Sequence, residues 1–181
     1  MKSHETLHLW WFRERECLVQ LPDRLLNCMK ALAAKAMPNE TGGTLVGYYS
    51  RDRQVAFVTQ ILVAKTGARR ERSGFFRPPD SVDDQLEKVY RDSEGSIYYL
   101  GDWHSHPMGA PTPSSVDLYT LKGLARSPSV ATDTPIMIIL GGDLDSQPLT
   151  SCTLAEKSGR CLDGDYEEST RNGTSGGRKD Q

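Results

Sequence analysis

An uninterrupted apolar run at residues 135–140, PIMIIL, constrains the architecture of this chain more than any other feature. The run is far shorter than the roughly 20 residues of a membrane span, and Gly141 and Gly142 end it. Short continuous runs of this kind are typical of central strands whose two faces are both buried. The chain is therefore expected to form a layered domain in which helices cover a sheet.

The segments around this run predict the other elements of such a domain. Apolar and β-branched residues indicate strands, one or two within 7–21 and others at 45–49, 55–63, 97–103, 150–154 and near Cys161. Helical spacing indicates three helices, from Asp23 to Pro38, from a Ser81–Asp84 capping box through Tyr90, and from Ser114–Ser115 through Leu124. This order predicts a single α/β (α+β) domain, a mixed sheet flanked by helices.

Two segments do not fit the pattern of regular elements. Residues 65–80, KTGARRERSGFFRPPD, are basic and rich in Gly and Pro, which predicts a surface loop. The loop could guide a substrate, or be a solvated loop with Phe75 and Phe76 on the core, and charge runs favour the second interpretation. From Asp163 the chain has almost nothing to bury, so we expect a domain at 1–162 and a disordered polar tail at 163–181.

Composition excludes several classes of function. Lys and Arg number 22 against 24 Asp and Glu, a net charge of −2 that gives no support to nucleic-acid binding. The sequence has no apolar run of membrane-spanning length and no signal segment at its start, so we expect a cytoplasmic protein without a membrane partner. The four cysteines, at 17, 28, 152 and 161, form no CxxC pair and are expected to be thiols. A 152–161 disulfide across a hairpin stays open.

The stretch GDWHSHP at 101–107 carries the clearest chemistry. Alternation along a strand places His104 and His106 on one face. Asp117, at the start of the next helix, can add a carboxylate to the two imidazoles. Two nitrogens and one oxygen, with the fourth corner left for water, are typical of a catalytic zinc site rather than a structural one.

Each part of this pattern also has a plainer interpretation. An HxH sequence is often incidental, and Ser114-x-x-Asp117 has the form of a helix capping box. A capping box and a metal site are compatible here, because a serine that caps the helix also fixes the helix start. Trp103 is expected in the core, and Ser105 is expected to point away from the metal on the opposite strand face.

The run HSHPMGAPTPSSVD at 104–117 resembles the motif of the JAMM (MPN+) zinc metalloproteases, H-[ST]-H, seven residues, then S-x-x-D. That motif also has an upstream glutamate before a glycine-rich strand, which Glu40 and TGGTLVG at 41–47 match. The resemblance covers about residues 22–145. It implies an MPN/JAB-like domain with a mainly antiparallel sheet, and a zinc (Zn²⁺) cofactor.

The resemblance also implies a role for each motif residue. His104, His106 and Asp117 would be the zinc ligands, Glu40 the general base that later protonates the leaving amine, and Ser114 the oxyanion donor. The position of Glu40 agrees with this, because a carboxylate at a helix C-terminus opposes the helix dipole and needs another reason to be there.

Overall likeness is greatest to the prokaryotic JAB-domain peptidases of CBASS anti-phage operons. This likeness implies a deubiquitinase-like isopeptidase that hydrolyses the bond after the C-terminus of a ubiquitin-like modifier or a conjugated CD-NTase, and so releases it from target lysines. The modifier's tail would lie along a strand edge, with strand 55–63 and loop 65–80 as candidates. Two alternatives stay open: a JAMM peptidase that processes a sulfur-carrier or other ubiquitin-like protein, and a zinc-stabilised interaction module without activity.

Overall fold

The computed structural model describes residues 5–63, 69–71, 74–76, 82–143 and 149–170. In these ranges, nine strands form one mixed sheet in the order β10-β9-β8-β7-β3-β4-β2-β1-β11. The strands are β1 (Thr6–Phe12), β2 (Cys17–Pro22), β3 (Gly42–Tyr49), β4 (Val55–Leu62), β7 (Tyr98–Pro107), β8 (Ile136–Gly142), β9 (Leu149–Ala155), β10 (Cys161–Asp163) and β11 (Asp165–Thr170). Only the β2–β4 and β7–β8 pairs are parallel. The expected α/β (α+β) domain with a mainly antiparallel sheet is confirmed.

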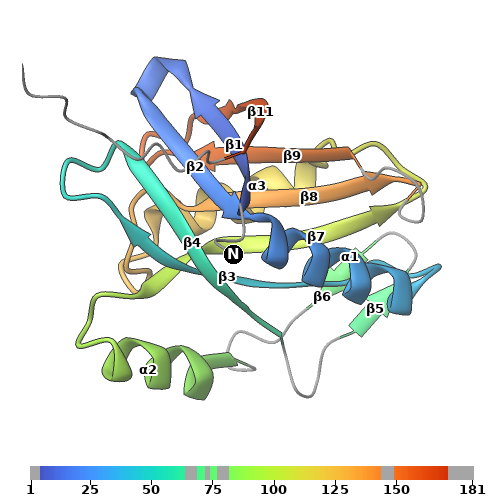
Figure 1. Ribbon diagram of the computed structural model, residues 1–181, viewed down its shortest axis with the longest axis horizontal. Helices are drawn as coiled ribbons and strands as arrows, with labels where there is room; N and C mark the ends of the chain where they lie inside the picture. The colour runs from blue at the N-terminus through green and yellow to red at the C-terminus, as the bar shows by residue number, and fades with distance from the viewer. Residues whose placement is uncertain (1–4, 64–68, 72–73, 77–81, 144–148, 171–181) are drawn as a thin grey trace, which may run out of the picture.

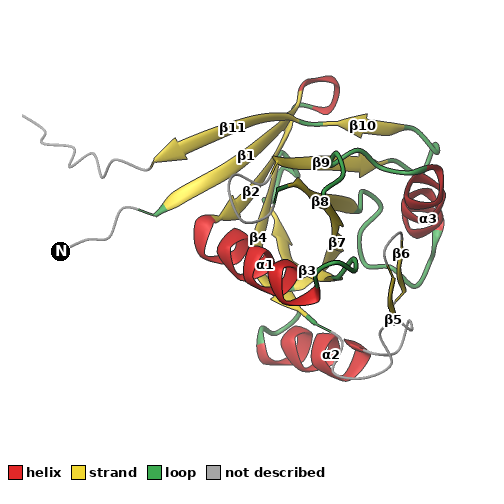
Figure 2. Cartoon of the chain, turned by 90° about the vertical axis from the view of Figure 1, so that its right-hand side faces the viewer, coloured by secondary structure: helices red, strands yellow, loops and turns green. Residues whose placement is uncertain are grey.

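Three helices flank the sheet: α1 (Asp23–Ala36), α2 (Asp83–Asp92) and α3 (Ser115–Arg126). The sheet curls around a core that α1 joins through Leu25, Leu26, Met29 and Ala33 (Figure 2). On the outer face, α2 packs on Val46 and Leu62, and α3 packs on Met137 and Ile139. In Figure 1, α2 lies apart from α1, at the lower left, and the two helices pack on different clusters of core residues.

Strand β8 occupies the central position that its apolar run predicts, between β7 and β9. Ile136, Ile138 and Leu140 face the main core, whereas Met137 and Ile139 face α3. Both faces of the strand are buried, and this explains why its sequence does not alternate with polar residues.

The N-terminus of α2 differs from the predicted capping box. Its N-cap residue is Val82, with no side-chain capping hydrogen bond, and Ser81 lies outside the described residues. Asp83 and Asp84 in the first turn stabilise the positive end of the helix dipole instead.

The loop predicted at 65–80 contains a short antiparallel hairpin, so the prediction is wrong for these residues. Strand β5 (Arg69–Glu71) pairs with β6 (Gly74–Phe76). The side-chain positions of Phe75 and Phe76 lie outside what the structure describes. Two three-residue strands are too short to leave a clear alternation in a sequence this rich in Arg, Gly and Pro.

The predicted tail boundary at residue 163 is also wrong, because β11 completes the sheet beside β1. The Tyr166 hydroxyl lies 2.8 Å from His8 Nδ1, its ring packs on Trp10, and Asp165 pairs with Arg13 at 2.8 Å. These polar and aromatic contacts hold an edge strand that needs few apolar residues. Residues 171–181 lie outside the described residues.

Two expectations from the composition concern the cysteines and membrane-spanning segments. Cys17, Cys28, Cys152 and Cys161 are all free thiols, so the 152–161 disulfide is not formed. No helix in the described part of the chain is long and apolar enough to cross a membrane.

Candidate metal centre

Strand β7 places two imidazoles side by side. The strand pairs with β3 on one side, where Gly42 faces His104, and with β8 on the other, where Ile139 faces His104. Alternation then directs His104 and His106 to the same face. Their Nε2 atoms lie 3.0 Å apart and their ring centroids 4.8 Å apart.

The start of α3 brings Asp117 to the two rings. The helix begins with a reciprocal capping box, as predicted: Ser114 Oγ accepts from Asp117 N at 3.2 Å, and Ser114 N donates to Asp117 Oδ2 at 2.7 Å. Asp117 Oδ1 lies 3.5 Å from His104 Nε2, and Oδ2 lies 3.8 Å from His106 Nε2. The capping box therefore fixes the carboxylate against both histidines.

Burial by itself would raise the pKa of Asp117. Hydrogen bonds from His104 and Ser114, and the charge of His104, outweigh burial and lower that pKa well below its usual range. The carboxylate is therefore ionised at neutral pH, as a metal ligand has to be.

A backbone contact sets the orientation of the His106 ring. Its Nδ1 lies 3.0 Å from the carbonyl oxygen of Ala110, which can only accept a hydrogen bond. Nδ1 therefore carries the hydrogen of the neutral ring, and the lone pair lies on Nε2, toward His104 and Asp117. A hydrogen bond of this kind is the usual outer support of a metal-binding histidine.

The three side chains fit a metal ion. One ligand atom from each of His104, His106 and Asp117 lies within 4.8 Å of the others. Ligand nitrogens of a tetrahedral zinc lie about 3.3 Å apart, close to the 3.0 Å between the two Nε2 atoms. Two nitrogens and one carboxylate oxygen are a donor set that Zn²⁺ accepts.

Glu40 reaches this group from the segment between α1 and β3. Thr41, the next residue, is tied to β7 in both directions: its N–H donates to Ser105 Oγ at 3.1 Å, and its carbonyl accepts from Ser105 N at 2.8 Å. Burial raises the pKa of Glu40, the charges of His106 and His104 lower it, and Asp117 raises it further, with a net upward shift. Glu40 therefore lies in the field of all three candidate ligands.

Ser105 and Trp103 occupy the positions expected of them. Both side chains are buried, Trp103 in the main core and Ser105 against Thr41. Ser105 points away from the imidazoles and holds the chain that carries Glu40. The HxH pattern predicted the direction of the Ser105 side chain. It did not predict the partner of that side chain, Thr41, which is 64 residues away in the sequence.

Sequence reasoning missed a polar group on the same strand face. Asp102 lies two residues before His104 and accepts hydrogen bonds from Thr44 Oγ1 at 3.1 Å and Tyr99 Oη at 2.9 Å. The only signal for it was the alternation that places Asp102, His104 and His106 on one side of β7.

Comparison with known protein families shows which family the chain belongs to. The family of prokaryotic homologues of the JAB domain, Prok-JAB, matches residues 22–154, more than half of the chain. All candidate residues, from Glu40 to Asp117, lie inside this match. The chain belongs to the Prok-JAB family.

Two curated relatives of the chain carry names that describe an activity. A probable metalloprotease from Sinorhizobium fredii is 33% identical over 69% of this chain and 76% of its own length. A CD-NTase/cGAS isopeptidase from Enterobacter hormaechei is 35% identical over 60% of this chain, which spans 59% of that relative. The family and these names support a peptidase activity for the chain.

A solved structure has the same fold. The solution structure of a protein from Desulfitobacterium hafniense superimposes with a TM-score of 0.52 at 25% identity, covering 80% of this chain and 86% of that one. The expectation of a single JAB-like domain is thereby confirmed.

Proposed function

We propose that this Prok-JAB chain is a cytoplasmic, zinc-dependent isopeptidase. Its reaction would hydrolyse the bond after the C-terminus of a ubiquitin-like modifier or a conjugated CD-NTase, releasing it from a target lysine. The observation that carries the proposal is the convergence of His104, His106 and Asp117 within reach of the charge of Glu40.

His104, His106 and Asp117 would hold the zinc, with Nε2, Nε2 and a carboxylate oxygen as ligands. Zinc held there would supply Lewis-acid activation of a water molecule and of the scissile carbonyl. The capping box and the Ala110 carbonyl orient two of these ligands before any metal binds.

Glu40 would move the proton of the reaction. A carboxylate with a raised pKa can take a proton from the attacking water and then give it to the leaving amine. The leaving amine of a lysine needs that proton because it is a poor leaving group when unprotonated. The Thr41–Ser105 pair keeps Glu40 beside β7 for both transfers.

Ser114 would stabilise the developing oxyanion. Its Oγ accepts from Asp117 N, which holds the hydroxyl at the start of α3, and the hydroxyl hydrogen would donate to the substrate carbonyl oxygen. A donor of this kind contributes on the order of 3 kcal/mol to the transition state.

The tail of the modifier would add to the free part of β4. Pairing with β2 covers only Val55–Phe57, whereas pairing with β3 continues to Leu62. Beyond Phe57, no strand in the described residues covers that edge of β4, and Arg24 Nη2 donates to Thr59 O there. An extended peptide can gain backbone hydrogen bonds at such an edge.

The choice of a CD-NTase conjugate rests on the relatives. Isopeptidases from Enterobacter hormaechei and Escherichia coli whose names specify CD-NTase/cGAS are both 35% identical to this chain. The test is intact-mass analysis of a CD-NTase joined through its C-terminus to a lysine, before and after incubation with the zinc-loaded chain. We expect release of the CD-NTase with a free native C-terminus.

Two variants separate catalysis from folding. Glu40→Gln keeps the shape of the side chain and should abolish release while the chain retains zinc. Glu94→Gln removes a carboxylate from the turn between α2 and β7 and should release the CD-NTase at the wild-type rate. Full activity of Glu40→Gln would overturn the acid–base assignment, and no release by a folded, zinc-bound wild type would overturn the choice of conjugate.

A further inference from the structure

A pocket of about 480 Å³ lies at the end of α3 remote from the metal centre. Three segments form it: the β3–β4 turn with Arg53, residues 127–133 between α3 and β8, and the β9–β10 turn with Lys157. Helix α3 starts at the metal centre and ends at this pocket with Arg126. Its 12 residues, at about 1.5 Å each, separate the two sites by about 18 Å.

The charges that line this pocket do not balance. Arg53, Arg126 and Lys157 contribute three cations, and Asp133 is the only carboxylate among the lining residues. Arg53 Nη2 donates to Asp133 Oδ1 at 2.8 Å and to Thr134 Oγ1 at 3.2 Å. Neither Arg126 nor Lys157 has an ion pair or side-chain hydrogen bond with any residue that the structure describes.

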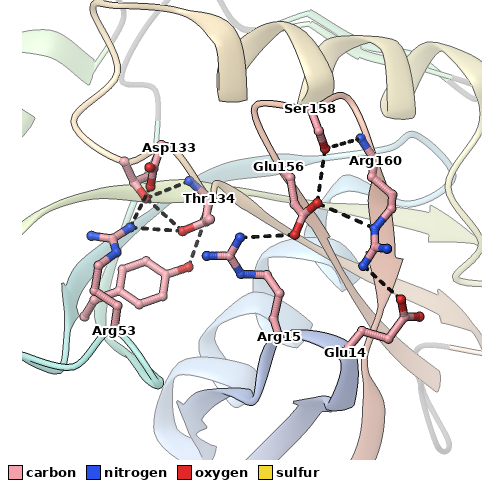
Figure 3. Close-up of polar contacts among 10 residues, drawn as sticks. Glu14, Arg15, Arg53, Asp133, Thr134, Glu156, Ser158 and Arg160 are labelled. Carbon is pink, nitrogen blue, oxygen red and sulfur yellow. Dashed lines mark hydrogen bonds and ion pairs between the residues drawn. The ribbon is translucent and has the colours of Figure 1, made fainter.

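Other carboxylates at this end of the molecule already bind other cations (Figure 3). Glu156 accepts from Arg15 at 3.1 Å and pairs with Arg160 at 3.5 Å, and Glu14 pairs with Arg160 at 2.8 Å. These ion pairs leave no nearby described carboxylate to neutralise Arg126 and Lys157. The pocket therefore keeps an excess of two positive charges.

The structure also fixes the guanidinium groups in place. Arg53 lies 4.7 Å above the ring of Tyr49, whose hydroxyl donates to Thr134 O at 2.8 Å. Gly159 has a φ of +89°, and a Cβ there would lie 2.1 Å from Arg126 Nη2. The missing side chain of Gly159 is therefore the space that the Arg126 guanidinium occupies.

We propose that this pocket binds the phosphate group of a small phosphorylated ligand. Guanidinium groups match the oxygens of phosphate in geometry as well as in charge. A phosphate dianion neutralises the excess of two charges, whereas a single carboxylate leaves one cation unpaired. The volume lies within the range of pockets that hold small ligands. This inference does not depend on the proposed peptidase activity.

The test is a titration of the full, zinc-loaded chain with inorganic phosphate, followed residue by residue in amide NMR spectra at constant ionic strength. We expect saturable shifts at residues 127–133 and 157–159. Arg126→Gln combined with Lys157→Gln should raise the Kd at least about 10-fold, the effect of losing one charge-assisted contact. The matched control, Lys30→Gln with Lys35→Gln, removes the same charge from α1 and should change the Kd less than about twofold.

Gly159→Ala gives an independent measurement, because it displaces Arg126 without removing a charge. It should weaken phosphate binding while the dispersion of the spectrum confirms the fold. Three results would overturn the proposal. The amide shifts could be confined to the metal centre, they could fail to saturate with phosphate, or the α1 control could lose as much phosphate affinity as the pocket variant. A single-stranded oligonucleotide that binds tighter than phosphate monoesters, with a steep salt dependence, would overturn it in favour of a polymer backbone.

Discussion

The carboxylate of Asp117 takes part in both the capping box of α3 and the candidate metal centre. Oδ2 accepts from the backbone of Ser114 at the start of α3, and Oδ1 faces His104. A residue of the capping box that begins the helix is thus also the one that completes the candidate metal centre. This sharing makes the position of the third ligand depend on helix formation rather than on a flexible loop.

Two substitutions of Asp117 should separate these roles. Asp117→Asn keeps an acceptor for Ser114 N, so stability should fall little, while zinc affinity should fall at least about 10-fold because the anionic ligand is lost. Asp117→Ala should lose zinc and also about 1 kcal/mol of unfolding free energy with the capping box. Competition with a fluorescent zinc chelator and urea unfolding measure the two quantities. A full complement of zinc in Asp117→Ala would contradict the ligand assignment.

Ser114 allows a similar separation between stability and rate. Glycine is tolerated at N-caps, so Ser114→Gly should cost only a few tenths of a kcal/mol of stability. The loss of the hydroxyl should lower kcat by about 10² if it stabilises the oxyanion. Ser114→Thr, which keeps a hydroxyl, is the control, measured with the same conjugate. A kcat equal to that of the wild type in Ser114→Gly would remove Ser114 from the reaction.

At the scale of elements, the packing of β3 against β4 and β7 leaves no room for a side chain at Gly43, next to the metal centre. A Cβ at Gly43 would lie 2.4 Å from the carbonyl oxygen of Leu62 and 2.9 Å from Trp103 Nε1. Gly123, in the middle of α3, has nothing within 4 Å of the same position.

The two glycines should therefore respond to alanine in opposite ways. Gly43→Ala should lower the free energy of unfolding by about 1–3 kcal/mol, because backbone has to move to accept it. Gly123→Ala should raise it by about 0.5–1 kcal/mol through helix propensity. Urea unfolding of both variants is the measurement. Equal effects in the two variants would show that β3 can shift relative to β4 and β7 without cost.

Strand β11 depends on polar contacts more than on apolar burial. The Tyr166 hydroxyl bonds to His8 Nδ1, and the other ring nitrogen of the buried His8 faces Asp23 at 3.0 Å. Tyr166→Phe should therefore cost about 1 kcal/mol by leaving a buried nitrogen without its partner. Tyr119→Phe, on the exposed side of α3, should leave the unfolding midpoint unchanged. If the two variants were equally stable, β11 would be held by its backbone pairing with β1 alone.

Elements with a strong apolar pattern were predictable from the sequence, and elements held by other contacts were not. The continuous apolar run identifies strand β8, which is buried on both faces, and helical spacing identifies the buried side of α1. Strand β11 has the composition of a tail, and its stability comes from His8 and Trp10, more than 150 residues earlier in the chain. The capping box of α3 formed as its spacing predicts, whereas α2 begins at Val82 without one.

The candidate metal centre was predictable for a similar reason. Strand alternation and one helix start bring His104, His106 and Asp117 together within 14 residues of sequence. The proposed phosphate pocket has no such local signal, because its cations come from three separate places in the chain: the β3–β4 turn (Arg53), the end of α3 (Arg126) and the β9–β10 turn (Lys157). Only the folded chain shows that two of these cations lack a carboxylate among the described residues.

At the scale of the whole molecule, the metal centre is supported by elements that are stable without it. Strand β7 is paired on both sides, and α3 packs on β8 through its own apolar cluster. Removal of zinc with EDTA should therefore abolish peptidase activity while circular dichroism shows the fold retained. Return of activity on adding zinc is the control. Unfolding of the stripped chain would instead indicate a structural zinc, as in a non-enzymatic interaction module.

The pairing of β1 with β11 brings Thr6 opposite Thr170, so the two ends of the sheet region lie side by side. Figure 2 shows them on the side of the molecule away from α3. The chain can therefore be closed into a ring by a short linker and reopened elsewhere, for example in the exposed turn at 51–54, without crossing the candidate active site. A partner protein joined before Thr6 or after Thr170 would leave from the same edge of the sheet.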